Sequence, residues 1–128
     1  MKPTILLCGR MLTRDQALLT KLRADADISH AATVSSLDSQ LLAKDITLIV
    51  CELSEAWQEE LETLESFMLL SPKMMSVVVC DSESVSTVTR AFQAGAKDCF
   101  SKPYRADLLA ERIKALLQSR VAPAGGVS

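Results

Sequence analysis

The sequence predicts an α/β fold in which a five-stranded parallel sheet is covered by helices on both faces. Five short apolar runs alternate with helix-like segments along the chain. The connections between successive runs are long enough to hold a helix, as parallel pairing requires. Several runs are rich in β-branched residues, which is typical of strands buried on both faces. In such open sheets the chemistry lies where the carboxyl ends of the strands meet their loops.

The length of the chain, 128 residues, fits one domain. We assign residues 1–120 to this domain. Residues 121–128 include Pro123 and the pair Gly125-Gly126, and we expect them to form a flexible tail or the start of a linker.

Each predicted strand is a short apolar run. The central run, from Ile46 to Leu53, ends at the acid Glu52. The run from Ile28 to Val34 is more polar, as expected near a sheet edge. The remaining strands are predicted at residues 4–8, 76–80 and 98–100.

The first two helices are predicted from capping and spacing. Thr13 and Gln16 have the spacing of a capping box, so we expect a helix to begin there. Its apolar face would carry Leu18, Leu19 and Leu22. A short second helix is expected over residues 36–43, with inward leucines at Leu37, Leu41 and Leu42.

Three further helices follow from apolar residues at helical spacing. One begins near Glu55 and ends before Pro72, with Trp57, Leu61, Leu64 and Met68 on its apolar face. The next is capped by Ser82 or Ser84 and ends at Gly95, and its apolar residues are Val85, Val88 and Phe92. The last carries Leu108, Leu109, Ile113, Leu116 and Leu117.

Composition excludes several classes of function. The net charge is −2, so this segment has no basic footprint for nucleic acid. The apolar runs are too short to span a bilayer, and no signal peptide is visible, so we expect a cytoplasmic protein without membrane contact. The four cysteines show no CxxC spacing, which argues against a zinc site or redox motif. No cofactor is indicated.

The segment from Ala94 to Tyr104, AGAKDCFSKPY, resembles the end of a response-regulator receiver domain. This family has the CheY-like, flavodoxin-like fold, and its pattern here is roughly A-G-A-x-x-[YF]-x-x-K-P-[FY]. The resemblance covers residues 3–119 in the order and length of the elements. It implies a doubly wound sheet of order 2-1-3-4-5 with five helices.

The resemblance also implies where a receiver would keep its chemistry. Receivers accept a phosphoryl group on an aspartate and hold Mg²⁺ with an acid pair, and they use a hydroxyl and a lysine on the phosphoryl oxygens. The matching positions are Glu52 for the acceptor, Gly9 and Arg10 for the acid pair, Cys80 for the hydroxyl, Lys102 for the lysine and Cys99 for the aromatic switch residue.

These departures predict a site without metal or phosphoryl chemistry. Mg²⁺ needs hard oxygen ligands, and neither Gly9 nor Arg10 supplies a carboxylate. Glutamate is one methylene longer than aspartate, so Glu52 would misplace the attacking oxygen. We expect Glu52 to pair with Lys102 or Arg10 and hold one conformation. The alternative is that it is a tolerated acid without a switching role.

The chain is therefore predicted to be a non-enzymatic, degenerate receiver-like signalling domain of the two-component type. It would act without phosphorylation, through protein contacts to an output domain, a partner or a second copy. The expected surface is the face of the fourth helix, fifth strand and fifth helix, which carries Arg90, Gln93, Lys97, Asp98, Arg105, Glu111 and Arg112.

Two alternatives remain open. An active phospho-receiver with unusual chemistry would use Asp81, beside Cys80. A thiol-based or soft-metal sensor would use cysteines at the strand ends. We expect Cys8 and Cys51 to be small core residues instead, with Cys80 at the solvent rim as the most reactive thiol. Trp57 is expected to pack back on the sheet, and no role is assigned to His30.

Overall fold

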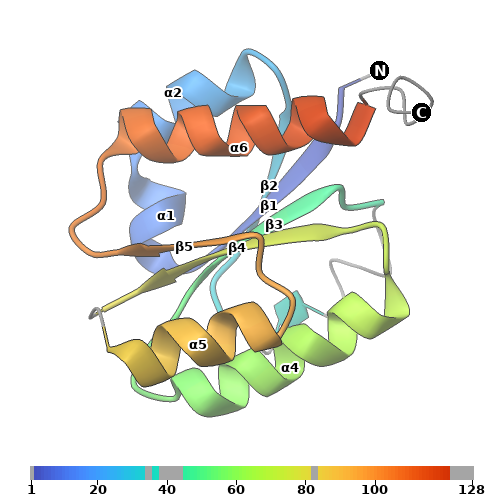
Figure 1. Cartoon of the computed structure of the whole chain (residues 1–128). Coiled ribbons are helices and arrows are strands. Elements are labelled where there is room, and N and C mark those ends of the chain that lie inside the picture. The colour runs from blue at the N-terminus through green and yellow to red at the C-terminus, as the bar shows by residue number, and fades with distance from the viewer. Residues whose placement is uncertain (1, 34–35, 38–44, 82–83, 122–128) are drawn as a thin grey trace.

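A computed structural model describes residues 2–33, 36–37, 45–81 and 84–121. For residues 120 and 121 it describes the backbone but not the side chains. Its centre is a parallel sheet of five strands in the order β2-β1-β3-β4-β5 (Figure 1). This is the predicted order. The strands are β1 (Thr4–Cys8), β2 (Asp27–Ala31), β3 (Leu48–Glu52), β4 (Met75–Cys80) and β5 (Asp98–Ser101).

Helices cover both faces of the sheet, as predicted. Helices α2 and α6 lie on one face, and α4 and α5 on the other (Figure 1). The described helices are α1 (Arg10–Arg14), α2 (Gln16–Arg23), α4 (Trp57–Leu70), α5 (Val85–Gln93) and α6 (Ala106–Val121). The helix expected over residues 36–43 falls largely outside the described residues, as do Val34 and Ser82; Leu37 is buried.

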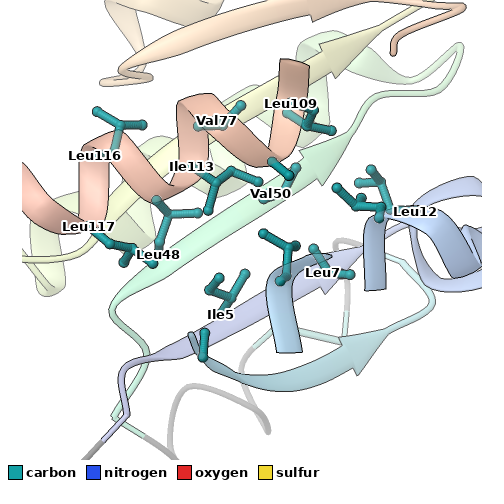
Figure 2. Close-up of a cluster of buried hydrophobic side chains, with 14 of the residues drawn as sticks. Ile5, Leu7, Leu12, Leu48, Val50, Val77, Leu109, Ile113, Leu116 and Leu117 are labelled. Carbon is teal, nitrogen blue, oxygen red and sulfur yellow. The ribbon is translucent and has the colours of Figure 1, made fainter. Parts of the chain in front are cut away.

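Alternate residues of the central strands build two separate cores, because successive side chains point to opposite faces. Figure 2 shows the core under α6, where Leu7, Val50 and Val77 of three strands meet Ile113. The opposite core contains the intervening strand residues and the α4 and α5 side chains. Every residue of β4 is buried, which explains its continuous apolar sequence.

The first helical segment is divided at Asp15, which was not predicted. Asp15 has an extended backbone, and its side chain accepts a hydrogen bond from the Leu18 amide at 3.0 Å. Thr13 lies inside α1, and its hydroxyl donates to the Arg10 carbonyl. The predicted capping box from Thr13 to Gln16 is therefore wrong, because Asp15 caps α2 in its place.

The inward face of α5 was also predicted wrongly. Val85 is 80% exposed and Phe92 48% exposed, whereas Thr87 and Ala91 are buried. The small residues Thr87 and Ala91 therefore occupy the inward positions, and the larger Val85 and Phe92 lie outside. Gly95 ends the segment as expected, and its φ of +107° favours glycine.

Two smaller differences concern the other helices. The helix expected near Glu55 begins at Trp57, and Trp57 packs against the core as predicted. Leu108 of α6 is 47% exposed rather than inward, whereas Leu109 and Ile113 are fully buried.

Candidate functional site

The carboxyl ends of the strands surround an open cavity of about 430 Å³. Its lining includes Gly9 and Arg10 after β1, Glu52 at the end of β3, Asp81 after β4 and Lys102 after β5. Parallel strands bring their carboxyl ends to one edge, so residues far apart in sequence meet here. The structure therefore gathers the acceptor, acid-pair and lysine positions predicted from the sequence.

Glu52 is held by donors on both of its carboxylate oxygens. Oε2 lies 2.6 Å from the Lys102 ammonium, and Oε1 accepts a hydrogen bond from the Met11 amide at 2.9 Å. Only 13% of the Glu52 side chain is exposed. The predicted ion pair is confirmed for Lys102, whereas Arg10 makes no ion pair with Glu52. Glu52 also satisfies a free amide at the start of α1.

Lys102 bridges two acids from neighbouring strands. Its ammonium contacts Glu52 and lies 3.0 Å from Asp81, and its backbone amide donates to the Cys80 carbonyl. Burial lowers the pKa of Lys102, but the hydrogen bonds to Glu52 and Asp81 outweigh it and raise the pKa above its usual value. The ammonium therefore stays charged. Asp81 is 63% exposed, so its share of the bridge is screened by water.

Gly9 has a backbone that only glycine adopts readily, with φ at +131°. A Cβ at this position would overlap both Cβ and Oε1 of Glu52. The longer glutamate side chain thus fills the space that a side chain at Gly9 would need. The two departures from the receiver pattern, at Gly9 and Glu52, fit each other sterically.

The residues present do not fit Mg²⁺. This ion requires near-octahedral oxygen ligation, but both Glu52 oxygens are engaged by protein donors. Gly9 and Arg10 supply no carboxylate, and Lys102 places a positive charge beside the remaining acids. Within the described ranges, no group of three or more His, Cys, Asp or Glu side chains is arranged to hold a metal ion.

The cysteines form two neighbouring pairs at this end of the sheet. Cys8 and Cys51 are directly opposite each other on β1 and β3, and both are buried core residues, as predicted. Cys80 is only 1% exposed, so the prediction that it lies at the solvent rim is wrong. As the last residue of β4 it packs in the core beneath α4 and α5, where its sulfur contacts Cys99.

A side-chain hydrogen bond beside the site was not predicted from the sequence. The Tyr104 hydroxyl donates to Asp15 at 2.7 Å, joining the segment after β5 to the start of α2. Burial is the main reason that the pKa of Tyr104 is raised, and the nearby Asp15 adds to it. Tyr104 belongs to the motif that carries the family resemblance, but nothing in its local sequence names Asp15 as its partner.

The predicted partner face combines internal ion pairs with exposed apolar residues. Arg90 pairs with Glu65 at 2.8 Å and Arg112 pairs with Asp98 at 2.9 Å. Among the described residues of α5 and α6, the large exposed apolar side chains are Val85, Phe92 and Leu108.

The comparisons with known proteins rest on structure, because no protein-family model and no curated protein matches the sequence. A CheY-like response regulator receiver domain from Methanospirillum hungatei JF-1 is 22% identical, with a TM-score of 0.80 over 94% of this chain and 97% of its own. A response regulator from Thermotoga maritima is 21% identical, with a TM-score of 0.81 over 92% and 99%.

A third neighbour is a longer protein. The Thermotoga maritima response regulator DrrB, an OmpR/PhoB homolog, is 18% identical with a TM-score of 0.78, and the match covers 93% of this chain but 54% of DrrB. Of the helices in the described residues, none has the length and apolar character to cross a membrane. The chain therefore has the CheY-like fold of these response regulators.

Proposed function

We propose that residues 1–120 form a receiver-like signalling domain of a two-component response regulator that works without phosphorylation. The observation that carries this proposal is the double engagement of Glu52. Its carboxylate oxygens are bound by Lys102 and by the Met11 amide, at the position that the resemblance assigns to the phosphoryl acceptor. The proposed module is non-enzymatic and cytoplasmic.

Phosphoryl transfer depends on positioning and on charge neutralisation by a metal ion. An acceptor oxygen must reach the phosphorus in line, and the metal must bridge the phosphoryl oxygens. Glu52 has no oxygen free of a protein donor, and the neighbouring Gly9 and Arg10 offer no metal ligand. The positive charge of Lys102 is already balanced by Glu52 and Asp81.

The same contacts support a fixed conformation. Glu52 joins the end of β3 to the start of α1 and, through Lys102, to the segment after β5. A carboxylate held against this lysine supplies part of the charge that a phosphoryl group would supply. In this proposal the domain stays in one signalling state, which its partner recognises without an input from a kinase.

The proposed contact surface is the face of α5, β5 and α6. Its exposed apolar residues, Val85, Phe92 and Leu108, are accompanied by charges of both signs, a composition suited to a protein partner. The partner would be a second copy, an output domain following this one, or another protein. The net charge of the chain is −2, and this overall balance does not favour nucleic acid as the partner.

The direct test is intact-protein mass spectrometry after incubation with acetyl phosphate and Mg²⁺. We expect no phosphorylated species. A phosphoryl adduct at Glu52 would overturn the proposal, and an adduct at Asp81 would support the alternative of an active receiver with unusual chemistry. A receiver domain with the usual acceptor aspartate, treated in parallel, shows that the reagent is active.

The role of the fixed state is tested with Glu52→Gln, which keeps the size of the side chain but removes its charge. If the Glu52 carboxylate sets the signalling state, the variant should alter self-association in sedimentation experiments or partner capture, while Phe92→Ser should weaken either one directly. Unchanged binding in the Glu52→Gln variant would leave Glu52 as a structural residue only.

A further inference from the structure

The two cysteines at the junction of β4 and β5 touch through their sulfur atoms. Cys80 is the last residue of β4, opposite Ser101, and Cys99 lies opposite Val78. The two cysteines are therefore diagonal neighbours on the same face of adjacent strands. Their sulfurs are 2.8 Å apart and share a hydrogen bond, and both cysteines are free thiols.

The surroundings shift the pKa values of the two thiols in opposite directions. The hydrogen bond from Cys99 is the main cause that lowers the pKa of Cys80. Burial and the Asp81 charge oppose this shift, and the Lys102 charge adds to it. The same hydrogen bond raises the pKa of Cys99 above its usual value, together with burial. Of the two thiols, Cys80 is thus the one that loses its proton more readily. A thiolate next to a second thiol is the arrangement found at redox-active cysteine pairs.

We propose that Cys80 and Cys99 are a reversible oxidation site, which hydrogen peroxide converts to a disulfide between β4 and β5. The Cys80 thiolate attacks one peroxide oxygen, the O–O bond breaks, and hydroxide leaves, giving a sulfenic acid. Cys99 then attacks that sulfur, forming the S–S bond and releasing water. Each sulfur loses one electron, and the peroxide gains two. A dithiol reductant reverses the reaction by thiol–disulfide exchange.

The other thiol pair of the molecule provides an internal comparison. Cys8 and Cys51 are also neighbours across two strands. They are 1% and 0% exposed, and a hydrogen bond from Cys8, with burial, raises the pKa of Cys51 well above its usual value. The charges of Glu60 and Glu52 also raise the pKa of Cys51, so a thiolate is disfavoured there and we expect this pair to stay reduced.

The low solvent exposure of the two cysteines limits which oxidants can reach them. Cys80 is 1% exposed and Cys99 is only partly exposed. The thiol with the lowered pKa therefore belongs to the more buried residue, and the more exposed cysteine has the raised pKa. A small peroxide should therefore react faster than a bulky disulfide such as oxidised glutathione, and both should react slowly compared with an exposed thiolate.

Oxidation would act on the region that holds the ion-pair site. Cys80 precedes Asp81, and its carbonyl accepts the Lys102 amide, so a covalent link between β4 and β5 would fix the segment that carries Lys102. By the resemblance, these two cysteines occupy the hydroxyl and aromatic switch positions. A disulfide there offers an input to the α5, β5 and α6 face that is independent of phosphorylation at Glu52.

The experiment treats the reduced full chain with hydrogen peroxide, blocks remaining thiols under denaturing conditions, and maps tryptic peptides by mass spectrometry. We expect a linked pair of peptides, residues 74–90 with residues 98–105, which dithiothreitol separates. The number of free thiols should fall from four to about two, since one disulfide consumes two thiols. Cys8→Ser and Cys51→Ser should still form the link.

Further variants keep the assignment testable. In Cys99→Ser, a sulfenic-acid probe such as dimedone should label Cys80, because the resolving thiol is gone; circular dichroism checks that the variant is folded. Oxidation that gives only sulfinic or sulfonic acids, a link between Cys8 and Cys51, or linked peptides from two different chains would overturn the proposal. So would a wild-type chain that retains all its thiols under conditions that oxidise a control dithiol.

Discussion

The ends of β3 and β4 carry the same kind of dipeptide but differ in what surrounds it. Each ends in a cysteine followed by an acid: Cys51 and Glu52 on β3, and Cys80 and Asp81 on β4. The Glu52 side chain is 13% exposed and bound at both oxygens, whereas Asp81 is 63% exposed and contacts Lys102. The chemistry of a strand end is thus set by its neighbours across the sheet, and not by its own sequence.

The cysteines at the two strand ends also differ in their surroundings, but here the β4 residue has the more distinctive partner. Cys51 lies at the end of a central strand and pairs with an equally buried thiol, Cys8. Cys80 pairs with Cys99 of the edge strand, which is partly exposed. The β3 end therefore holds the structurally important acid, and the β4 end holds the reactive thiol. The following changes would break or sharpen this distinction.

The largest change in the free energy of unfolding is expected for Gly9→Ala, which disturbs the Glu52 side chain at the end of β3. The change would place a Cβ against Glu52 and force a positive φ on alanine, so we expect a loss of about 2–5 kcal/mol in the free energy of unfolding. Urea denaturation measures it. Gly95→Ala is the matched control, because its φ is also positive but its Cβ would meet Met68 at an ordinary 3.7 Å. Equal losses in both variants would deny the steric link between Gly9 and Glu52.

A smaller loss is expected when the shared cation is removed. Lys102→Met would leave Glu52 without its charged partner while only 13% of its side chain is exposed. We expect the free energy of unfolding to fall by about 1.5–3 kcal/mol. A variant as stable as the wild-type chain would show that the Glu52 contact to Lys102 contributes little.

The pH dependence of the free energy of unfolding tests the environments of Lys102 and Tyr104. The folded chain raises the pKa values of Lys102 and Tyr104, so it binds both protons more tightly than the unfolded chain does. This contribution is complete below the unfolded pKa values, about 10 for both groups, and is lost as pH rises through the folded values. Stability should fall above about pH 10, and less steeply in Lys102→Met and Tyr104→Phe. Identical slopes in all three proteins would contradict the raised pKa values.

The smallest effect belongs to the β4 acid. Asp81→Asn removes a charge that is 63% exposed, so the change in the free energy of unfolding should be within about 0.5 kcal/mol. Thermal unfolding of this variant beside Lys102→Met provides the comparison. A loss for Asp81→Asn as large as that for Lys102→Met would place the anchoring acid on β4 and reverse the account.

Much of this arrangement could be predicted because it depends on short-range patterns. The apolar runs located β1 and β4 almost to the residue, and the family resemblance carried by the motif from Ala94 to Tyr104 implied the sheet order. The pairing of Glu52 with Lys102 followed from the acceptor and lysine positions that the resemblance assigns to these two residues. Each of these inferences needs only the chain's local periodicity or one motif.

The remaining features depend on contacts that no local pattern specifies. The contact between Cys80 and Cys99 depends on the register with which β4 pairs with β5. The helix break at Asp15 depends on which of two possible residues, Thr13 or Asp15, caps α2. The outward position of Phe92 depends on the rotation of α5 about its axis, which places Thr87 and Ala91 inward. The positive φ of Gly9 becomes meaningful only with the Glu52 side chain in place.

The central claim is that the Glu52 carboxylate is occupied by protein donors and has no place for a metal or a phosphoryl group. Its most direct test is a crystal structure of the reduced chain grown with Mg²⁺ and beryllofluoride. The account predicts that Lys102 and the Met11 amide keep their contacts with Glu52 and that neither additive binds there. Beryllofluoride on Glu52 with Mg²⁺ beside it would contradict the account.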